Sequence, residues 1–153
     1  MRFAAAMHVL TAVIWVGGLF FAYFVLRPVA ANMLETHDRL NLWRKVLRRF
    51  FHFVWVSVII LFSTGYWMTL SLFGEVVNVP YHIGVMQALG ILMPLIFFYV
   101  YFSTYQRLQK HLMIDNYGPA SRILGEMRRL FGINLFLGVI VILVASSGRY
   151  WIN

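Results

Sequence analysis

The sequence predicts an all-α fold: a transmembrane four-helix bundle whose helices run alternately up and down. Four long apolar runs fill most of the 153 residues, and 61% of the residues are hydrophobic whereas 12% are charged. The mean hydropathy of +0.76 is too high for the surface of a soluble protein of this size. Since open strands would leave backbone groups unpaired in lipid, we expect each run to be a helix.

Each apolar run is long enough to cross a hydrocarbon layer about 30 Å thick, which takes about 20 helical residues. Asp, Glu, Lys and Arg are absent from the inner part of every run. We expect a single membrane domain over 1–153. We also expect the first run to be retained, because it is longer than the apolar part of a usual secretory signal. The four predicted spans are 3–26, 50–73, 81–105 and 130–151.

The distribution of basic residues predicts the orientation. Eleven of the thirteen Lys and Arg residues lie in the first and third gaps between the runs, whereas Glu75 is the charged residue of the second gap. Because basic loops stay in the cytoplasm, we expect both termini outside (N-out, C-out) and cytoplasmic helical extensions in the two basic gaps. The same bias explains the net charge of +8. The expected partner is therefore the lipid bilayer and not nucleic acid.

The two basic gaps carry their own structural signals. Pro28 is expected to disturb the end of the first helix, and Thr36 or Asp38 is expected to cap the next one. The breaker cluster at 115–119 predicts a turn between two helical stretches. Three apolar residues at helical spacing in the first gap are predicted to lie toward the bilayer surface: Leu40, Trp43 and Leu47.

Chemistry in such a chain depends on the few polar side chains inside the spans, because burying them costs free energy. With no Cys, a metal or cofactor must be held by His, Met or backbone groups. His8 and His82 lie in the predicted outer leaflet, on the first and third helices, which are diagonal partners in a bundle wound in sequence order.

Two diagonal imidazoles suit a haem b with one axial His ligand from each side, and this is the first of three hypotheses. Trp15 shares the helical face of His8, and Arg2 and Arg149 would pair with the propionates. Such a protein would transfer electrons or be an accessory subunit of a larger membrane complex.

The second hypothesis is a copper site at the outer face. Imidazole and thioether ligands favour Cu(I), and four such residues lie toward the predicted outer side: His8, His82, Met68 and Met86. Met also fills gaps in apolar packing, so this set is equally compatible with ordinary core residues.

The third hypothesis is a membrane interaction or assembly protein without a cofactor, acting as a homo-oligomer or within a larger complex. A small-residue face on the third run would allow close helix contact there: Gly84, Gln87, Gly90 and Ile91. An independent enzyme is not expected, because the sequence offers no nucleophile–base pair, no carboxylate dyad and no phosphate loop.

Several segments resemble one family. The first run has His8 followed by Trp15-x-Gly17-Gly18, and in this it resembles the first helix of the CopD-like copper-resistance membrane proteins. This resemblance implies copper handling in the inner membrane of a bacterium. Further segments similar to that family are 47–51, 63–67, 128–130 and 134–138.

The chain is also distantly similar to the HemJ-type protoporphyrinogen oxidases, which have a first-helix His at the position of His8. That similarity implies a porphyrin site between the first and third helices. Those oxidases carry a His-x-Lys pattern at the start of the third helix, whereas this chain has His82-Ile83-Gly84. Gly84 in place of the Lys argues against oxidase activity.

Overall fold

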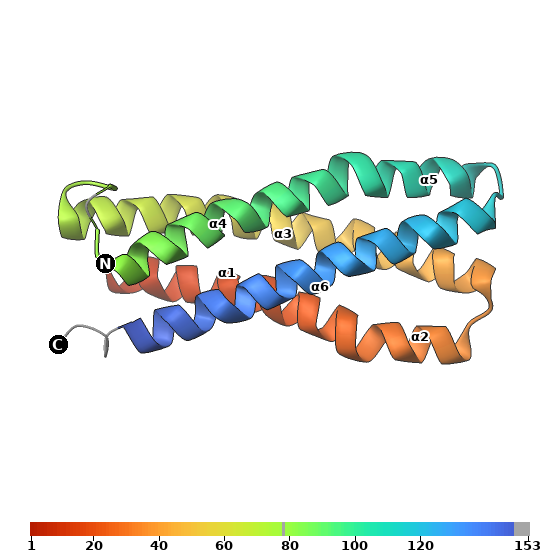
Figure 1. Ribbon diagram of the computed structural model, residues 1–153, viewed down its shortest axis with the longest axis horizontal. Coiled ribbons are helices and arrows are strands. Elements are labelled where there is room, and N and C mark those ends of the chain that lie inside the picture. Colours follow the sequence, from red (N-terminus) through yellow and green to blue (C-terminus); the bar gives the residue numbers. More distant parts are fainter. Residues whose placement is uncertain (78, 149–153) are drawn as a thin grey trace.

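The computed structural model describes residues 1–77 and 79–148, and they form four long helical rods (Figure 1). The first rod comprises α1 (Arg2–Phe20), the π-helical η1 (Phe21–Leu26) and α2 (Arg27–Met33). The second rod is α3 (Thr36–Phe73). The third comprises α4 (Tyr81–Tyr99), the π-helical η2 (Val100–Tyr105) and α5 (Gln106–Met113), and the fourth is α6 (Tyr117–Ser147). All four rods are long and apolar enough to span a membrane, so the predicted all-α four-helix fold is confirmed.

The rods alternate in direction. The start of α1, the end of α6 and the α3–α4 connection lie together at the left of Figure 1, and the two basic connections lie at the right. We call the left end the outer end and the right end the inner end, after the predicted orientation, which stays a prediction. The last part of the predicted fourth span, 149–151, lies outside the described residues.

The helices extend well beyond the predicted spans at the inner end. The first gap is helical except around Leu34 and Glu35. Pro28 does not end the first rod, because it lies in the first turn of α2, where its missing N–H costs little. The wide π-helical turn η1 just before it accommodates the ring, which would otherwise clash with the carbonyl four residues earlier.

The core is concentrated in the inner half. Leu40, Trp43 and Leu47 are almost completely buried, so their predicted position at the bilayer surface was wrong. This apolar stripe of α3 instead packs in the core that also holds Leu108 of α5 and Met127 of α6. The prediction failed because an amphipathic helix beside a membrane can bury its apolar face in lipid or in protein, and periodicity does not distinguish the two.

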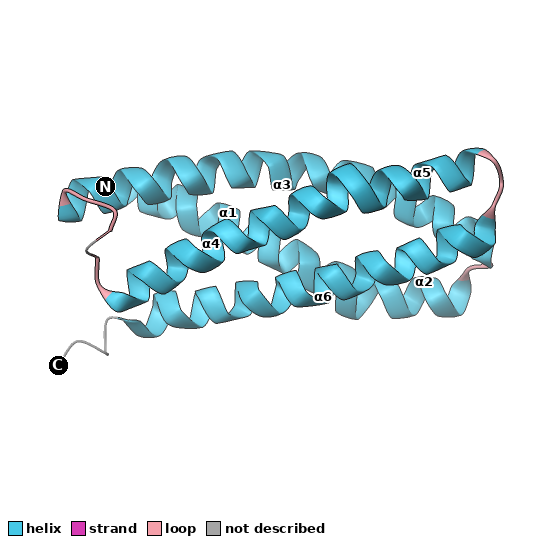
Figure 2. Cartoon of the chain, turned by 45° about the horizontal axis from the view of Figure 1, so that its top comes forward, coloured by secondary structure: helices cyan, strands magenta, loops and turns pink. Residues whose placement is uncertain are grey.

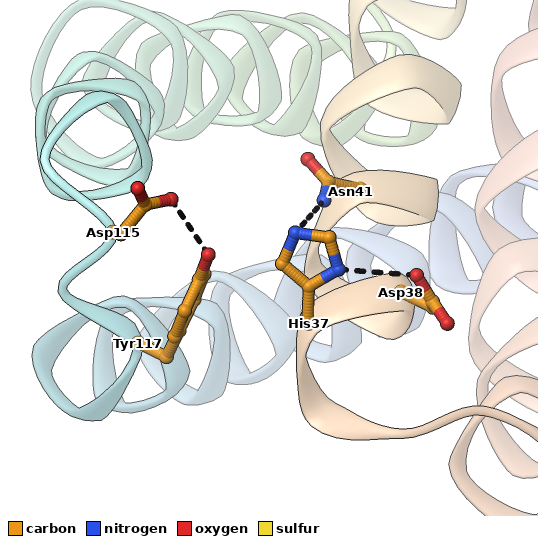
Figure 3. A network of polar contacts seen from close by, with 5 residues as sticks. All are labelled: His37, Asp38, Asn41, Asp115 and Tyr117. Atoms are coloured by element: carbon orange, nitrogen blue, oxygen red, sulfur yellow. Dashed lines mark hydrogen bonds and ion pairs between the residues drawn. The ribbon is translucent and has the colours of Figure 1, made fainter.

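Polar contacts hold the two inner connections (Figure 3). Asn41 Nδ2 donates to His37 Nε2 over 3.0 Å, and His37 Nδ1 donates to Asp38 Oδ1 over 3.1 Å. The Tyr117 hydroxyl donates to Asp115 Oδ1 over 2.6 Å, and its ring meets the His37 ring edge-on. The contact between the His37 and Tyr117 rings therefore links the start of α3 to the start of α6.

The cap of α3 differs slightly from the prediction. Neither Thr36 nor Asp38 is the N-cap residue, because Glu35 occupies that position without a side-chain cap bond.

The predicted turn at 115–119 is shorter than expected, since α6 already begins at Tyr117 and Pro119 lies within its first turn. An early helical position suits Pro because the first amides of a helix have no intrahelical acceptor.

Helix pairing is uneven around the bundle. The closest pairs are α1 with α3 and α4 with α6, whereas α1 and α4 are diagonal. Helices α3 and α4 diverge toward the outer end, at the left of Figure 2, although one short connection joins them. The backbones of α3 and α4 are therefore farther apart in the outer half than in the inner half.

Candidate functional site

A cavity of about 270 Å³ occupies the outer half, where α3 and α4 diverge. It is partly open, and all four rods line it: α1 with His8 and Trp15, the second half of α3, the first half of α4, and α6 with Gly138. Most of its lining is apolar, with a few polar and sulfur-bearing side chains among it. This composition is typical of a binding pocket, in which a few polar groups orient the guest.

The His8 imidazole has a defined hydrogen bond on one side. His8 Nδ1 lies 2.8 Å from Thr64 Oγ1, and the Thr64 hydroxyl lies 2.6 Å from the carbonyl oxygen of Ile60. A hydroxyl has one hydrogen, and Thr64 donates it to Ile60, so Thr64 Oγ1 accepts from His8 Nδ1–H. We assign His8 the tautomer with a proton on Nδ1. Nε2 then carries the lone pair that binds metals.

Three methionines line the same cavity: Met68 of α3, and Met86 and Met93 of α4. Met93 is 5% exposed and lies close to Gly138, whereas Met68 and Met86 are half-buried. One imidazole and three thioethers form a soft donor set, which suits Cu(I).

Gln87 also lines the cavity, and its buried Nε2 has no hydrogen-bond partner. An unpaired buried donor indicates that a polar guest or water completes the site.

The predicted site residues are only partly brought together. His8, Trp15, Met68 and Met86 all line the cavity. His82 does not line it; its ring lies against the backbone of Gly148 at the end of α6, where a Cβ would approach His82 Cγ to 2.8 Å.

The two arginines proposed for haem propionates give no further support to that site. Arg2 is exposed at the outer end and does not line the cavity. Arg149 lies outside the described residues.

The glycine face of α4 is not packed against another helix of this chain. Gln87, Gly90 and Ile91 line the cavity, and a Cβ at Gly84 or Gly90 would have no atom within 4 Å. The predicted close contact of this face with a partner helix stays a prediction.

Sequence reasoning did not identify Pro94 as a site residue or Thr64 as the partner of His8. Pro94 also lines the cavity, and because it has no N–H, the Gly90 carbonyl lacks its usual helical donor. Helical spacing was the available signal for the cavity-lining faces. Met86, Gly90 and Met93 follow an i, i+4, i+7 pattern, as do Leu61, Gly65 and Met68.

Comparison with known families agrees with this soft donor set. The family model described as copper resistance protein D (CopD) matches residues 44–147, about two thirds of the chain. The chain belongs to the CopD family. This CopD-family protein has no match among curated proteins or solved structures. The match does not extend to the HemJ-type oxidases, so that resemblance stays a prediction.

The described residues fit copper better than haem. Within 1–77 and 79–148, no group of three or more His, Cys, Asp or Glu side chains is placed to hold a metal ion. A metal in the cavity would therefore be held mainly by sulfur, as Cu(I) tolerates and harder ions do not. The haem hypothesis has no support from this arrangement, because the second proposed axial ligand, His82, does not line the cavity.

Proposed function

We propose that this CopD-family membrane protein binds Cu(I) as cargo in the outer-half cavity, at the outer face of a bacterial inner membrane. One observation carries the proposal: a histidine whose Nδ1 is hydrogen-bonded to Thr64 and three methionines line one partly open cavity. Membership of the copper-resistance family supports it independently.

The chain's own residues supply three features that such a site needs. Thr64 orients the His8 ring by accepting from its Nδ1–H, and in that tautomer Nε2 is the nitrogen that would bind the cargo. Met68, Met86 and Met93 offer neutral sulfur ligands, which avoid burying a net negative charge in the membrane. The cavity is partly open, which allows a cargo to enter.

Binding of Cu(I) to the purified protein tests the proposal. We expect about one Cu(I) per chain by competition with a chromogenic Cu(I) chelator under anaerobic conditions. His8→Ala and Met86→Leu are expected to weaken binding by at least about tenfold, since each removes a ligand. Thr64→Val is expected to weaken it by about tenfold, because loss of an outer partner of a metal-binding His typically costs 10- to 100-fold.

Matched controls separate the site from general effects. Met113→Leu removes an exposed methionine at the inner end, and His52→Ala removes an exposed histidine that donates to the Arg48 carbonyl. Both controls, and His82→Ala, are expected to bind Cu(I) like the unaltered protein. Equal binding by His8→Ala and His52→Ala would refute the proposal, as would the absence of Cu(I) binding by the folded protein.

A further inference from the structure

A second cavity, of about 140 Å³, lies at the inner end of the bundle, whereas the outer-half cavity lies toward the opposite end. Three arginines from three different helices line it: Arg27 at the start of α2, Arg39 near the start of α3, and Arg128 of α6. All three are half-buried. Trp43 and Ser121 contribute an indole ring and a hydroxyl group to the same cavity.

The positive charges around this cavity have no acidic counterpart there. Among the described residues, the recorded ion pairs join His37 to Asp38 and Arg107 to Glu126. Neither carboxylate lines the cavity, and Asp115 accepts from Tyr117. Three half-buried guanidinium groups around a space this small repel one another, and the repulsion is stronger than it would be in bulk water.

Helix packing holds the arginines in this arrangement. The Arg27 guanidinium lies over the Tyr23 ring at 5.2 Å from its centroid, which fixes the direction of its side chain. Arg39 lies beside the fully buried Leu40, and Arg128 lies beside the fully buried Met127, so the backbone at both positions is part of the packed core. The structure therefore maintains this unbalanced positive charge, which an anion would neutralise.

We propose that the inner-end cavity binds a phosphate-bearing anion, either the headgroup of an anionic phospholipid or free phosphate. Guanidinium groups match phosphate oxygens with paired hydrogen bonds, and three of them from separate helices would surround one phosphate. Ser121 adds a hydroxyl donor. Basic pockets between membrane helices on the cytoplasmic side are where anionic headgroups bind, and this cavity lies at the basic end of the bundle. The bound anion would link α2, α3 and α6.

Thermal unfolding of the full chain in a neutral detergent tests the site. The probes are short-chain phosphatidylglycerol, phosphatidylcholine of the same chain length, and inorganic phosphate with chloride as the ionic-strength control. We expect phosphatidylglycerol to raise the unfolding temperature and phosphatidylcholine to leave it unchanged. A rise with phosphatidylglycerol alone identifies a lipid headgroup, and a rise with inorganic phosphate as well identifies free phosphate as sufficient.

A charge-matched pair of variants locates the effect. Arg27→Gln/Arg39→Gln/Arg128→Gln removes the cavity arginines, whereas Arg49→Gln/Arg122→Gln/Arg129→Gln removes three exposed arginines of the same inner end. We expect the cavity variant to need at least about tenfold more lipid for the same rise, since it loses the charged hydrogen-bond donors of the cavity. The surface variant should respond like the unaltered protein.

The neighbouring single variants Arg128→Gln and Arg129→Gln provide the same comparison if the cavity triple variant does not fold. An equal loss of response in the cavity and surface variants would overturn the proposal, because it would show attraction to the overall charge of the inner end. No rise with either phosphate-bearing probe would overturn it as well.

Discussion

The two halves of this bundle are built differently, although all four rods run through both. In the inner half, Phe51 packs edge-on against Phe97, Tyr101 and Tyr105, with centroid separations of 5.0–5.6 Å. In the outer half, α3 and α4 diverge around a cavity of about 270 Å³. Aromatic packing is thus concentrated in the inner half, and the larger cavity lies in the outer half.

This division has a physical reason in a membrane. Lipid tails are as apolar as the helix surfaces, so helices associate through close packing and not through the hydrophobic effect. An empty cavity therefore costs the packing contacts of its lining. The densely packed aromatic cluster in the inner half offsets that cost, because each aromatic pair contributes about 0.5–1.5 kcal/mol to stability beyond its buried area.

The largest effect is expected from Phe51→Ala, which would break the inner cluster. Phe51 is 2% exposed, and its removal should leave a cavity that lowers the free energy of unfolding by about 3 kcal/mol. Phe53→Ala is the matched control, because Phe53 lies on the same helix and is 61% exposed. Thermal or denaturant unfolding in detergent measures both. Similar losses in the two variants would mean that the packing of Phe51 in the aromatic cluster does not stabilise the bundle.

A pair of cavity glycines sharpens the description of the outer half. A Cβ at Gly138 would lie 2.7 Å from Val16 Cγ2 and 3.2 Å from Met93 Cε, whereas a Cβ at Gly90 would meet open space. Gly138→Ala should lower the free energy of unfolding by about 1–2 kcal/mol through overpacking. Gly90→Ala should raise it by about 0.5–1 kcal/mol, since Ala favours the helix over Gly. Changes of the same sign in both variants would contradict the shape of the cavity.

The fold was more predictable than the site. Apolar length is a property of whole segments, and it predicted the four long helices correctly. The orientation that the arginines indicate stays a prediction. The direction of a single side chain depends on how its helix is rotated about its axis. Helix α4 is apolar on all sides, so its pattern does not show that Met86 faces the cavity while His82 faces Gly148.

The hydrogen bond between His8 and Thr64 could not be predicted from the sequence for a related reason. These residues are 56 positions apart, and Thr64 also satisfies its hydroxyl within its own helix, as Ser and Thr commonly do in membranes. The bond from Thr64 to the Ile60 carbonyl is compatible with a purely structural role for Thr64. The kinds of ligand in the proposed site do follow from the sequence, because a chain without Cys and without acidic residues inside its spans leaves His and Met as the side chains that a metal could use.

The smallest effect is expected at the surface of the inner half, where Arg107 Nη2 donates to both carboxylate oxygens of Glu126 over 2.9 and 3.0 Å. Both side chains are more than a third exposed, so the pair should contribute about 0.5 kcal/mol, and less at high salt. A double-mutant cycle of Glu126→Gln and Arg107→Gln, read by unfolding at low and high salt, isolates that contribution. The Tyr99 hydroxyl also donates to Glu126 over 3.2 Å, so Tyr99→Phe controls for this third partner. A coupling as large as the loss from Phe51→Ala would show that surface charge, and not the aromatic cluster, holds the inner half together.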